Sequence, residues 1–180
     1  MGLFDKFRKK SLNKEAFRLY HRRKYLEALK DYEKILIINP FDPVAWSSKG
    51  TVVFKLERYD EALKCYDKAL ELDPEYKEAL SNKGNILKEL GKYHEALKYY
   101  NKALKLDPEY VDAWNNKGVA LSKLKRYHEG LECFDKALKL DSEYINAWKN
   151  KALALSDLKR YEEALECCNE ALILNSTDID

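Results

Sequence analysis

The chain repeats its own pattern every 34 residues, and this period constrains its fold more than any other feature. Gly50, Gly84 and Gly118 are spaced at this interval. The same spacing separates five tyrosines, Tyr25, Tyr59, Tyr93, Tyr127 and Tyr161. Self-similarity at a fixed period of this size is typical of stacked repeat arrays, in which each unit contacts only its neighbours. The sequence therefore predicts an array of similar units rather than one ordinary core.

One unit, residues 77–110, shows the expected local structure. Its apolar residues form two runs at spacings of three and four, which place each run on one face of a helix. The first run is Ala79, Leu80, Ile86, Leu87 and Leu90, and the second is Tyr93, Ala96, Leu97, Tyr100, Ala103, Leu104 and Leu106. Gly91 lies between the runs, and Pro108 cannot continue the second helix. Each unit is predicted to form two antiparallel helices, with small residues such as Gly84 and Ala96 where the helices approach closely.

The residues at fixed offsets in each unit resemble the tetratricopeptide repeat. The second copy has Trp46, Gly50, Tyr59, Ala62, Tyr66, Ala69 and Pro74, and the third has Leu80, Gly84, Tyr93, Ala96, Tyr100, Ala103 and Pro108. The fourth has Trp114, Gly118, Tyr127, Gly130, Phe134 and Ala137, and the fifth has Trp148, Ala152, Tyr161, Ala164, Cys168 and Ala171. A more divergent first copy has Leu12, Ala16, Tyr25, Ala28, Tyr32, Ile35 and Pro40.

This resemblance implies an all-α fold, a right-handed α-solenoid of stacked antiparallel helix pairs. The expected organisation is an N-terminal segment, residues 1–8, followed by a single array over residues 9–178. Its repeats are expected at about 9–42, 43–76, 77–110, 111–144 and 145–178. Residues from Asn175 onward are predicted to form a tail.

Two features depart from the family pattern. Lysines occupy the place before the Gly or Ala, where the family usually has Leu: Lys49, Lys83, Lys117 and Lys151. We expect their stems to cover apolar surface while their ammonium groups reach water. Gly130 replaces an alanine inside a helix, and this replacement is expected to cost about 1 kcal/mol in helix propensity.

The resemblance also implies a concave groove lined by the first helices of successive repeats. Asn82, Asn116 and Asn150 recur there at the 34-residue interval, with Ser48 at the equivalent place and Asn85 nearby. A side-chain amide both donates and accepts, so a row of them can bind a peptide backbone with little regard for its side chains. The alternative is that asparagine is simply frequent at this place in the family.

The early part of the groove differs because it carries Phe17, Tyr20 and Phe54. These rings either form a pocket for an apolar anchor or pack under the N-terminal segment. That segment, with Leu3, Phe4 and Phe7 among basic residues, is expected to cap the first repeat or fray. The other interpretation is a helix that lies on a membrane surface.

Some members of the family hold a chaperone's terminal carboxylate with two Lys, two Asn and one Arg. The nearest match here is Ser81, Asn85, Asn116, Asn146 and Asn150, in which all three cationic places are Ser or Asn. Without those charges a carboxylate gains little, so the sequence argues against this function.

Charge argues against nucleic acid as the main partner. The formal net charge is only +2. Residues 1–42 hold 11 basic and 6 acidic side chains, whereas residues 145–180 hold 4 basic and 7 acidic ones. The basic character therefore fades along the chain, while RNA-reading helical repeats need base contacts in every repeat. RNA binding is kept as an alternative, with Arg18, Arg22, Arg23 and Lys24 as its strongest feature.

No arrangement of residues predicts catalysis, a metal site or a cofactor. His94 and His128 follow equivalent tyrosines, which indicates exposed helix starts. Cys65, Cys133 and Cys167 are equivalent, and with Cys168 they are expected to be free thiols in a reducing cytoplasm rather than redox groups. No apolar run is long enough to span a membrane, and the start lacks the apolar core of a signal peptide.

The last predicted helix would expose Leu165, Cys168 and Leu172 if no capping helix follows it. This surface could support a symmetric homodimer, and the charge polarity would permit head-to-tail contacts instead. The functional prediction is a non-catalytic cytoplasmic scaffold that binds a protein or peptide segment in its groove. A homo-oligomerising structural module is the alternative.

Overall fold

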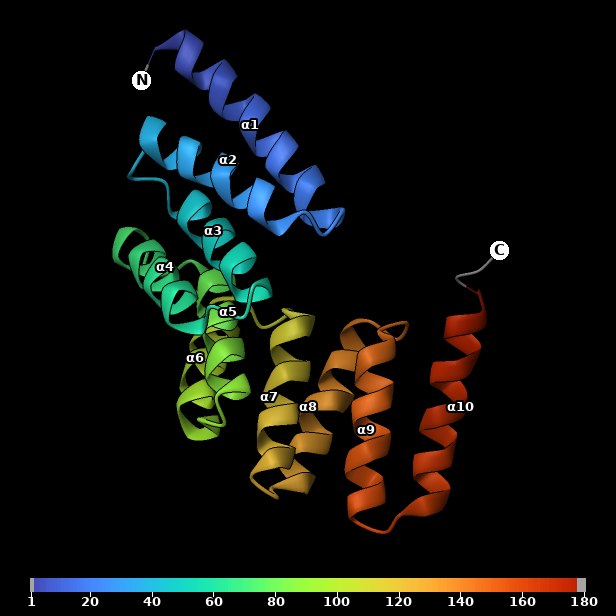
Figure 1. Cartoon of the computed structure of the whole chain (residues 1–180). Coiled ribbons are helices and arrows are strands. Elements are labelled where there is room, and N and C mark those ends of the chain that lie inside the picture. The colour runs from blue at the N-terminus through green and yellow to red at the C-terminus, as the bar shows by residue number, and fades with distance from the viewer. Residues whose placement is uncertain (1, 178–180) are drawn as a thin grey trace. The chain divides into compact units, whose positions relative to one another are not determined.

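A computed structural model describes residues 2–177 of the chain, which form ten helices and no strand (Figure 1). The helices are α1 (Leu3–His21), α2 (Tyr25–Ile38), α3 (Pro43–Lys55), α4 (Tyr59–Leu72), α5 (Lys77–Glu89), α6 (Tyr93–Leu106), α7 (Val111–Lys123), α8 (Tyr127–Leu140), α9 (Ile145–Asp157) and α10 (Tyr161–Thr177). Odd-numbered helices are the first helices of the predicted repeats, and even-numbered helices are the second.

The chain divides into two compact units, Met1–Ile86 and Leu87–Asp180, and the boundary falls inside α5. In the first unit, α1 packs with α2, α3 packs with α4, and α2 contacts α3. In the second, α7 packs with α8, α9 packs with α10, and α6 and α8 contact the first helices that follow them. Within each unit the predicted hairpins therefore stack through the second helix of one repeat and the first helix of the next.

A tight turn joins the two helices of every repeat. Its central residue has positive φ in all five copies: Arg23, Glu57, Gly91, Lys125 and Lys159. The following N–H donates back to the first helix, as from Lys24 to the carbonyl of Leu19 at 2.9 Å. This is the Schellman arrangement that ends a helix at a left-handed residue. Gly91, which the sequence predicted as a turn residue, takes the positive-φ position in the third repeat. Charged residues take the same position in the other four copies.

Close approach of the two helices depends on a glycine facing an aromatic ring. A Cβ added to Gly118 would lie 2.6 Å from a ring carbon of Phe134, and one added to Gly50 would lie 2.9 Å from the ring of Tyr66. Both rings are almost fully buried. In the fifth copy, Ala152 is paired in sequence with the smaller Cys168.

Gly130 has a role that helix propensity alone did not predict. A Cβ at this position would lie 2.7 Å from Oγ of Ser122 and 3.1 Å from the carbonyl oxygen of Gly118. The missing side chain therefore lets α7 and α8 approach one another closely.

Three lysines of the row form ion pairs with exposed carboxylates, contacts that the sequence did not predict. Lys151 pairs with Asp135 at 2.7 Å, and Lys49 pairs with Glu33 at 3.2 Å. Lys83 pairs with Asp67 in the same way. Each pair joins the first helix of one repeat to the second helix of the repeat before it.

Tryptophans support this lysine row. The ammonium groups of Lys49, Lys117 and Lys151 lie 5.9, 5.0 and 5.6 Å from the ring centres of Trp46, Trp114 and Trp148. Each indole N–H donates to the carbonyl of the residue six places earlier, in the turn between repeats, at 2.8 to 2.9 Å. The junction between repeats is therefore fixed by polar contacts as well as by apolar burial.

The two ends of the chain differ from expectation. Residues 3–8 form the first turns of α1, because Gly2 N–H bonds Asp5 and no helix breaker follows. Phe4 and Phe7 are exposed, so they do not fold against the first repeat. The predicted tail is also wrong in part, since α10 continues through Thr177, and residues 178–180 lie outside the described residues.

The three equivalent cysteines are buried, and Cys168 is exposed. Burial raises the pKa of the Cys65 and Cys133 thiols to about 11 and also raises the pKa of Cys167. A thiol that is both enclosed and protonated reacts slowly, because the thiolate is the nucleophile.

Replacing Gly118 with Ala is expected to destabilise the protein by about 1–3 kcal/mol, because the new methyl group overlaps the ring of Phe134. Urea unfolding followed by circular dichroism measures this change. In a Phe134→Cys background, which copies the fifth repeat, the same Gly118→Ala change should cost much less. Equal costs in both backgrounds would contradict the ring contact.

Titration with a thiol reagent at pH 8 should find one fast cysteine in the folded protein, Cys168, and four after denaturation. Cys168→Ser should remove the fast phase and leave the three slow thiols unchanged. Two or more fast thiols in the native protein would show that the second helices open more readily than their burial implies.

Candidate functional site

A hollow of about 180 Å³ lies between α1 and α3 of the first unit. We call it the aromatic hollow; it is lined by Phe17, Tyr20, His21, Tyr32, Ser48, Thr51 and Val52. The first helices supply its walls, and Tyr32 reaches it from α2. Because Tyr32 is only 5% exposed, its ring forms the floor, whereas Phe17 is 59% exposed at the rim.

The rings of this hollow hold one another in place. Phe17 lies 4.2 Å from His21 between ring centres, and Tyr20 lies 5.7 Å from Tyr25. Burial raises the pKa of Tyr20, and the neighbouring phenols Tyr25 and Tyr32 raise it further. Burial likewise raises the pKa of Tyr32, although a side-chain hydrogen bond with Ser48 opposes the rise. Both phenols therefore stay neutral, so the hollow offers apolar surface with polar hydroxyl groups.

A second hollow of about 180 Å³ lies between α7 and α9 of the second unit. We call it the amide hollow; it is lined by Val119, Ser122, Lys123, Phe134, Asn150, Leu153, Ala154 and Asp157. Seven of these residues, all except Asp157, lie 102 positions after a residue of the aromatic hollow. Val119 corresponds in this way to Phe17, for example, and Ala154 to Val52. This distance is three repeat lengths, so the two hollows are the same site built at two junctions.

The predicted asparagines make contacts with their own chain. Asn150 donates through Nδ2 to Oδ1 of the buried Asn115 at 2.9 Å, and Asn116 accepts through Oδ1 from Lys88 Nζ at 3.2 Å. Each contact leaves the other end of the amide, the Asn150 oxygen or the Asn116 nitrogen, to meet a ligand. Asn82 and Asn85 are half-buried on α5.

The structure brings Phe17, Tyr20 and Ser48 together in the aromatic hollow and places Asn150 in the amide hollow. Phe54 is not a lining residue, because its ring packs 5.7 Å from Tyr59 and joins the core. Tyr32 and Phe134 were not predicted as groove residues, although both occupy the aromatic position of the second helix. That periodicity was the signal that could have identified them as floors.

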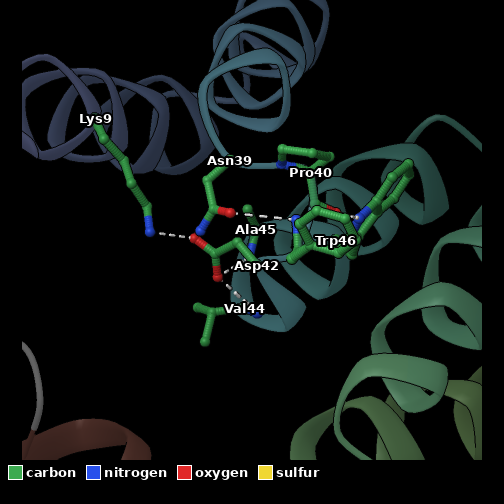
Figure 2. Close-up of polar contacts among 8 residues, drawn as sticks. Lys9, Asn39, Pro40, Asp42, Val44, Ala45 and Trp46 are labelled. Atoms are coloured by element: carbon green, nitrogen blue, oxygen red, sulfur yellow. Dashed lines mark hydrogen bonds and ion pairs between the residues drawn. The ribbon is translucent and has the colours of Figure 1, made fainter. Parts of the chain in front are cut away.

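A larger cleft of about 490 Å³ opens beside the start of α3 in the first unit. We call it the lysine cleft; it is lined by Lys6, Lys9, Lys10, Asn13, Asp42, Val44 and Ala45. Figure 2 shows the ammonium group of Lys9 directed at Asp42, with which it forms an ion pair. Asp42 Oδ1 also accepts from the N–H groups of Val44 and Ala45 at 3.1 and 3.2 Å, so it caps α3.

Three further observations bear on the class of site. No group of three or more His, Cys, Asp or Glu side chains within residues 2–177 is arranged to hold a metal ion. His21, His94 and His128 are all exposed. None of the helices described is both long and apolar enough to cross a membrane.

Comparison with known families identifies the class of protein. The sequence profile of the tetratricopeptide repeat matches residues 42–109, 111–144 and 145–178. These matches cover most of the chain. The chain belongs to the tetratricopeptide repeat family. No curated protein sequence matches it.

Solved structures share its fold. PilF from Pseudomonas aeruginosa is 22% identical with a TM-score of 0.84, covering 93% of this chain and 77% of that chain. MamA from Desulfovibrio magneticus RS-1 is 22% identical with a TM-score of 0.79, covering 96% and 98%. YrrB, described as a TPR protein with an unusual peptide-binding site, is 25% identical with a TM-score of 0.67, covering 88% and 82%. These likenesses confirm the predicted fold class, the right-handed α-solenoid of antiparallel helix pairs.

Proposed function

We propose that the protein is a non-catalytic scaffold that binds a polypeptide segment along the groove formed by its first helices. The observation that carries this proposal is the recurrence of one hollow at two junctions, residue for residue, three repeats apart. A binding site that recurs along the array suits a ligand whose binding groups also recur. A polypeptide is such a ligand, because its backbone presents an N–H and a C=O at every residue. YrrB offers a related precedent, since it is described as having an unusual peptide-binding site.

The asparagine ladder is part of this proposal. Asn82, Asn116 and Asn150 would bind the peptide backbone, with Ser48 and Asn85 as further polar contacts and Phe17 and Tyr20 holding a side chain. The bonds from Lys88 to Asn116 and from Asn150 to Asn115 support the ladder, because they fix the orientation of both amides before a ligand arrives. Fixed donors and acceptors lose less entropy on binding. Phe54, whose ring packs against Tyr59, is proposed to add apolar surface to the same groove.

Selection of a random ten-residue peptide library on the immobilised protein tests the proposal. Replacing Asn82, Asn116 and Asn150 together with Ala should weaken the selected peptides by at least about tenfold, because each amide contributes hydrogen bonds worth about 1 kcal/mol. Replacing Asn101, Asn169 and Asn175, which are exposed, with Ala is the matched control and should leave the affinity unchanged. Circular dichroism checks that both variants keep their helicity.

The outcomes separate the parts of the proposal. If peptides bind equally to the wild type and to the variant in which Asn82, Asn116 and Asn150 are replaced, the asparagine ladder is wrong, but the proposal of a scaffold is unaffected. If no peptide in the library binds, the scaffold proposal itself loses its support.

A second candidate function is self-association through α10. Leu165 and Leu172 are 62% and 67% exposed, although the equivalent leucines Leu97, Leu104, Leu131 and Leu138 are buried. α10 therefore exposes an apolar face that the earlier repeats bury. Pairing with a second copy of the chain would bury this face, and this pairing is the homodimer predicted from the sequence.

Light scattering during gel filtration tests this pairing. The wild type is expected to form a dimer at about 50 μM, and Leu165→Glu with Leu172→Glu should make it a monomer, because two charges in an apolar interface are costly to bury. Lys136→Gln with Lys139→Gln, on exposed positions of α8, makes the same change in net charge and should leave the dimer intact. A monomeric wild type would remove this candidate.

A further inference from the structure

Two hollows follow each other along one seam in the first unit, between the parallel helices α1 and α3. The lysine cleft takes Lys6 to Asn13 from α1 and Val44 with Ala45 from α3. The aromatic hollow takes Phe17 to His21 from α1 and Ser48 to Val52 from α3. Because both helices contribute in chain order, the cleft lies at the N-terminal end of the seam and the hollow at its C-terminal end.

The cleft carries surplus positive charge. Three lysines line it, and Asp42 is the single acidic residue among its lining. Lys9 pairs with Asp42, whose Oδ1 is already used in capping α3. Lys6 and Lys10 are exposed, and neither forms an ion pair with another of the described residues. Two ammonium groups therefore remain available to a ligand at this end of the seam.

The hollow at the other end is built for a single apolar side chain. Its floor is the buried ring of Tyr32 beside Val52, which is 1% exposed. Phe17 stands at the rim with most of its ring in solvent. A large apolar side chain entering the hollow would cover Phe17 and rest on Tyr32, and such enclosed aromatic contacts typically dominate binding energy.

We propose that this seam binds an acidic peptide segment that carries one aromatic or large aliphatic anchor. The inference rests on the proposed scaffold function and specifies the partner at one of its sites. The carboxylates lie against Lys6 and Lys10, and the anchor enters the aromatic hollow.

The spacing follows from helix geometry. Lys10 and Phe17 are seven residues apart on α1, which is about 10 Å along a helix axis. An extended peptide covers about 3.3 Å per residue, so the nearest carboxylate and the anchor are about three residues apart. The seam therefore selects for this spacing as well as for composition.

Single-stranded RNA is a weaker fit to the same residues, although lysines and rings can also bind phosphates and bases. An RNA strand gains affinity from several phosphate contacts in succession. The amide hollow, which repeats the same site in the second unit, is lined by one lysine and one aspartate and carries no surplus charge.

The test begins with the consensus of the selected ten-residue peptides. We expect acidic residues about three places from a Phe, Trp, Leu or Met. A fluorescein-labelled consensus peptide, measured by anisotropy, should bind the Lys6→Glu/Lys10→Glu variant at least about tenfold more weakly. Phe17→Ala should weaken peptide binding to a similar degree. The loss of affinity caused by the lysine variant should become smaller as the salt concentration rises, whereas the loss caused by Phe17→Ala should not.

The matched control is Lys136→Glu/Lys139→Glu, which makes the same change in net charge on exposed positions of α8. It should change the affinity by less than about twofold. Equal losses in the two lysine variants, or a consensus without acidic residues, would overturn the inference while leaving the scaffold standing. Tighter binding of a labelled 20-residue oligouridylate than of the peptide would also overturn it. A library without any binder would remove both proposals.

Discussion

The contact on which the rest of the structure depends is the close approach of the two helices in each repeat. Gly50 and Gly118 carry no side chain where Tyr66 and Phe134 pack against the first helix. The same ring position provides the floor of a groove hollow, with Tyr32 in the first unit and Phe134 in the second. The residues that close the hairpin therefore also shape the surface that we propose as the binding site.

Repetition converts this local contact into a binding surface. Pairs such as Lys151 with Asp135 tie one repeat to the next, and tryptophan N–H groups hold the turns between repeats. Because these polar contacts recur in register, equivalent groove positions acquire equivalent surroundings. Chemical differences among the hollows then come from a few side chains. Ser48 bonds the Tyr32 phenol, whereas Asn150, which faces a phenylalanine, turns its amide to Asn115.

The fold was largely predictable from the sequence because the helical spacing recurs in five copies, and because Gly91 and Pro108 mark helix ends in the third copy. For the same reason the sequence could place Phe17, Tyr20 and Ser48 on first helices, and these residues line one hollow in the structure. The partners of the charged groups at the ends of lysine side chains were not predictable from the sequence. The length of a lysine stem does not tell whether Lys49 reaches water or Glu33, and no pattern joined Lys9 to Asp42 across 33 positions. The sequence also did not indicate that the ring of Phe54 packs against Tyr59.

The central claim is that the partner binds the face formed by the first helices, with rings such as Tyr32 beneath it, and not the outer surfaces of the second helices. Chemical-shift mapping by nuclear magnetic resonance, with the isotope-labelled protein and a selected peptide, tests it most directly. The account predicts that the largest shifts fall on backbone amides of α1 and α3 around the aromatic hollow, with smaller shifts on α7 and α9. Shifts confined to the outer surfaces of α4, α6 and α8, or to α10, would contradict it.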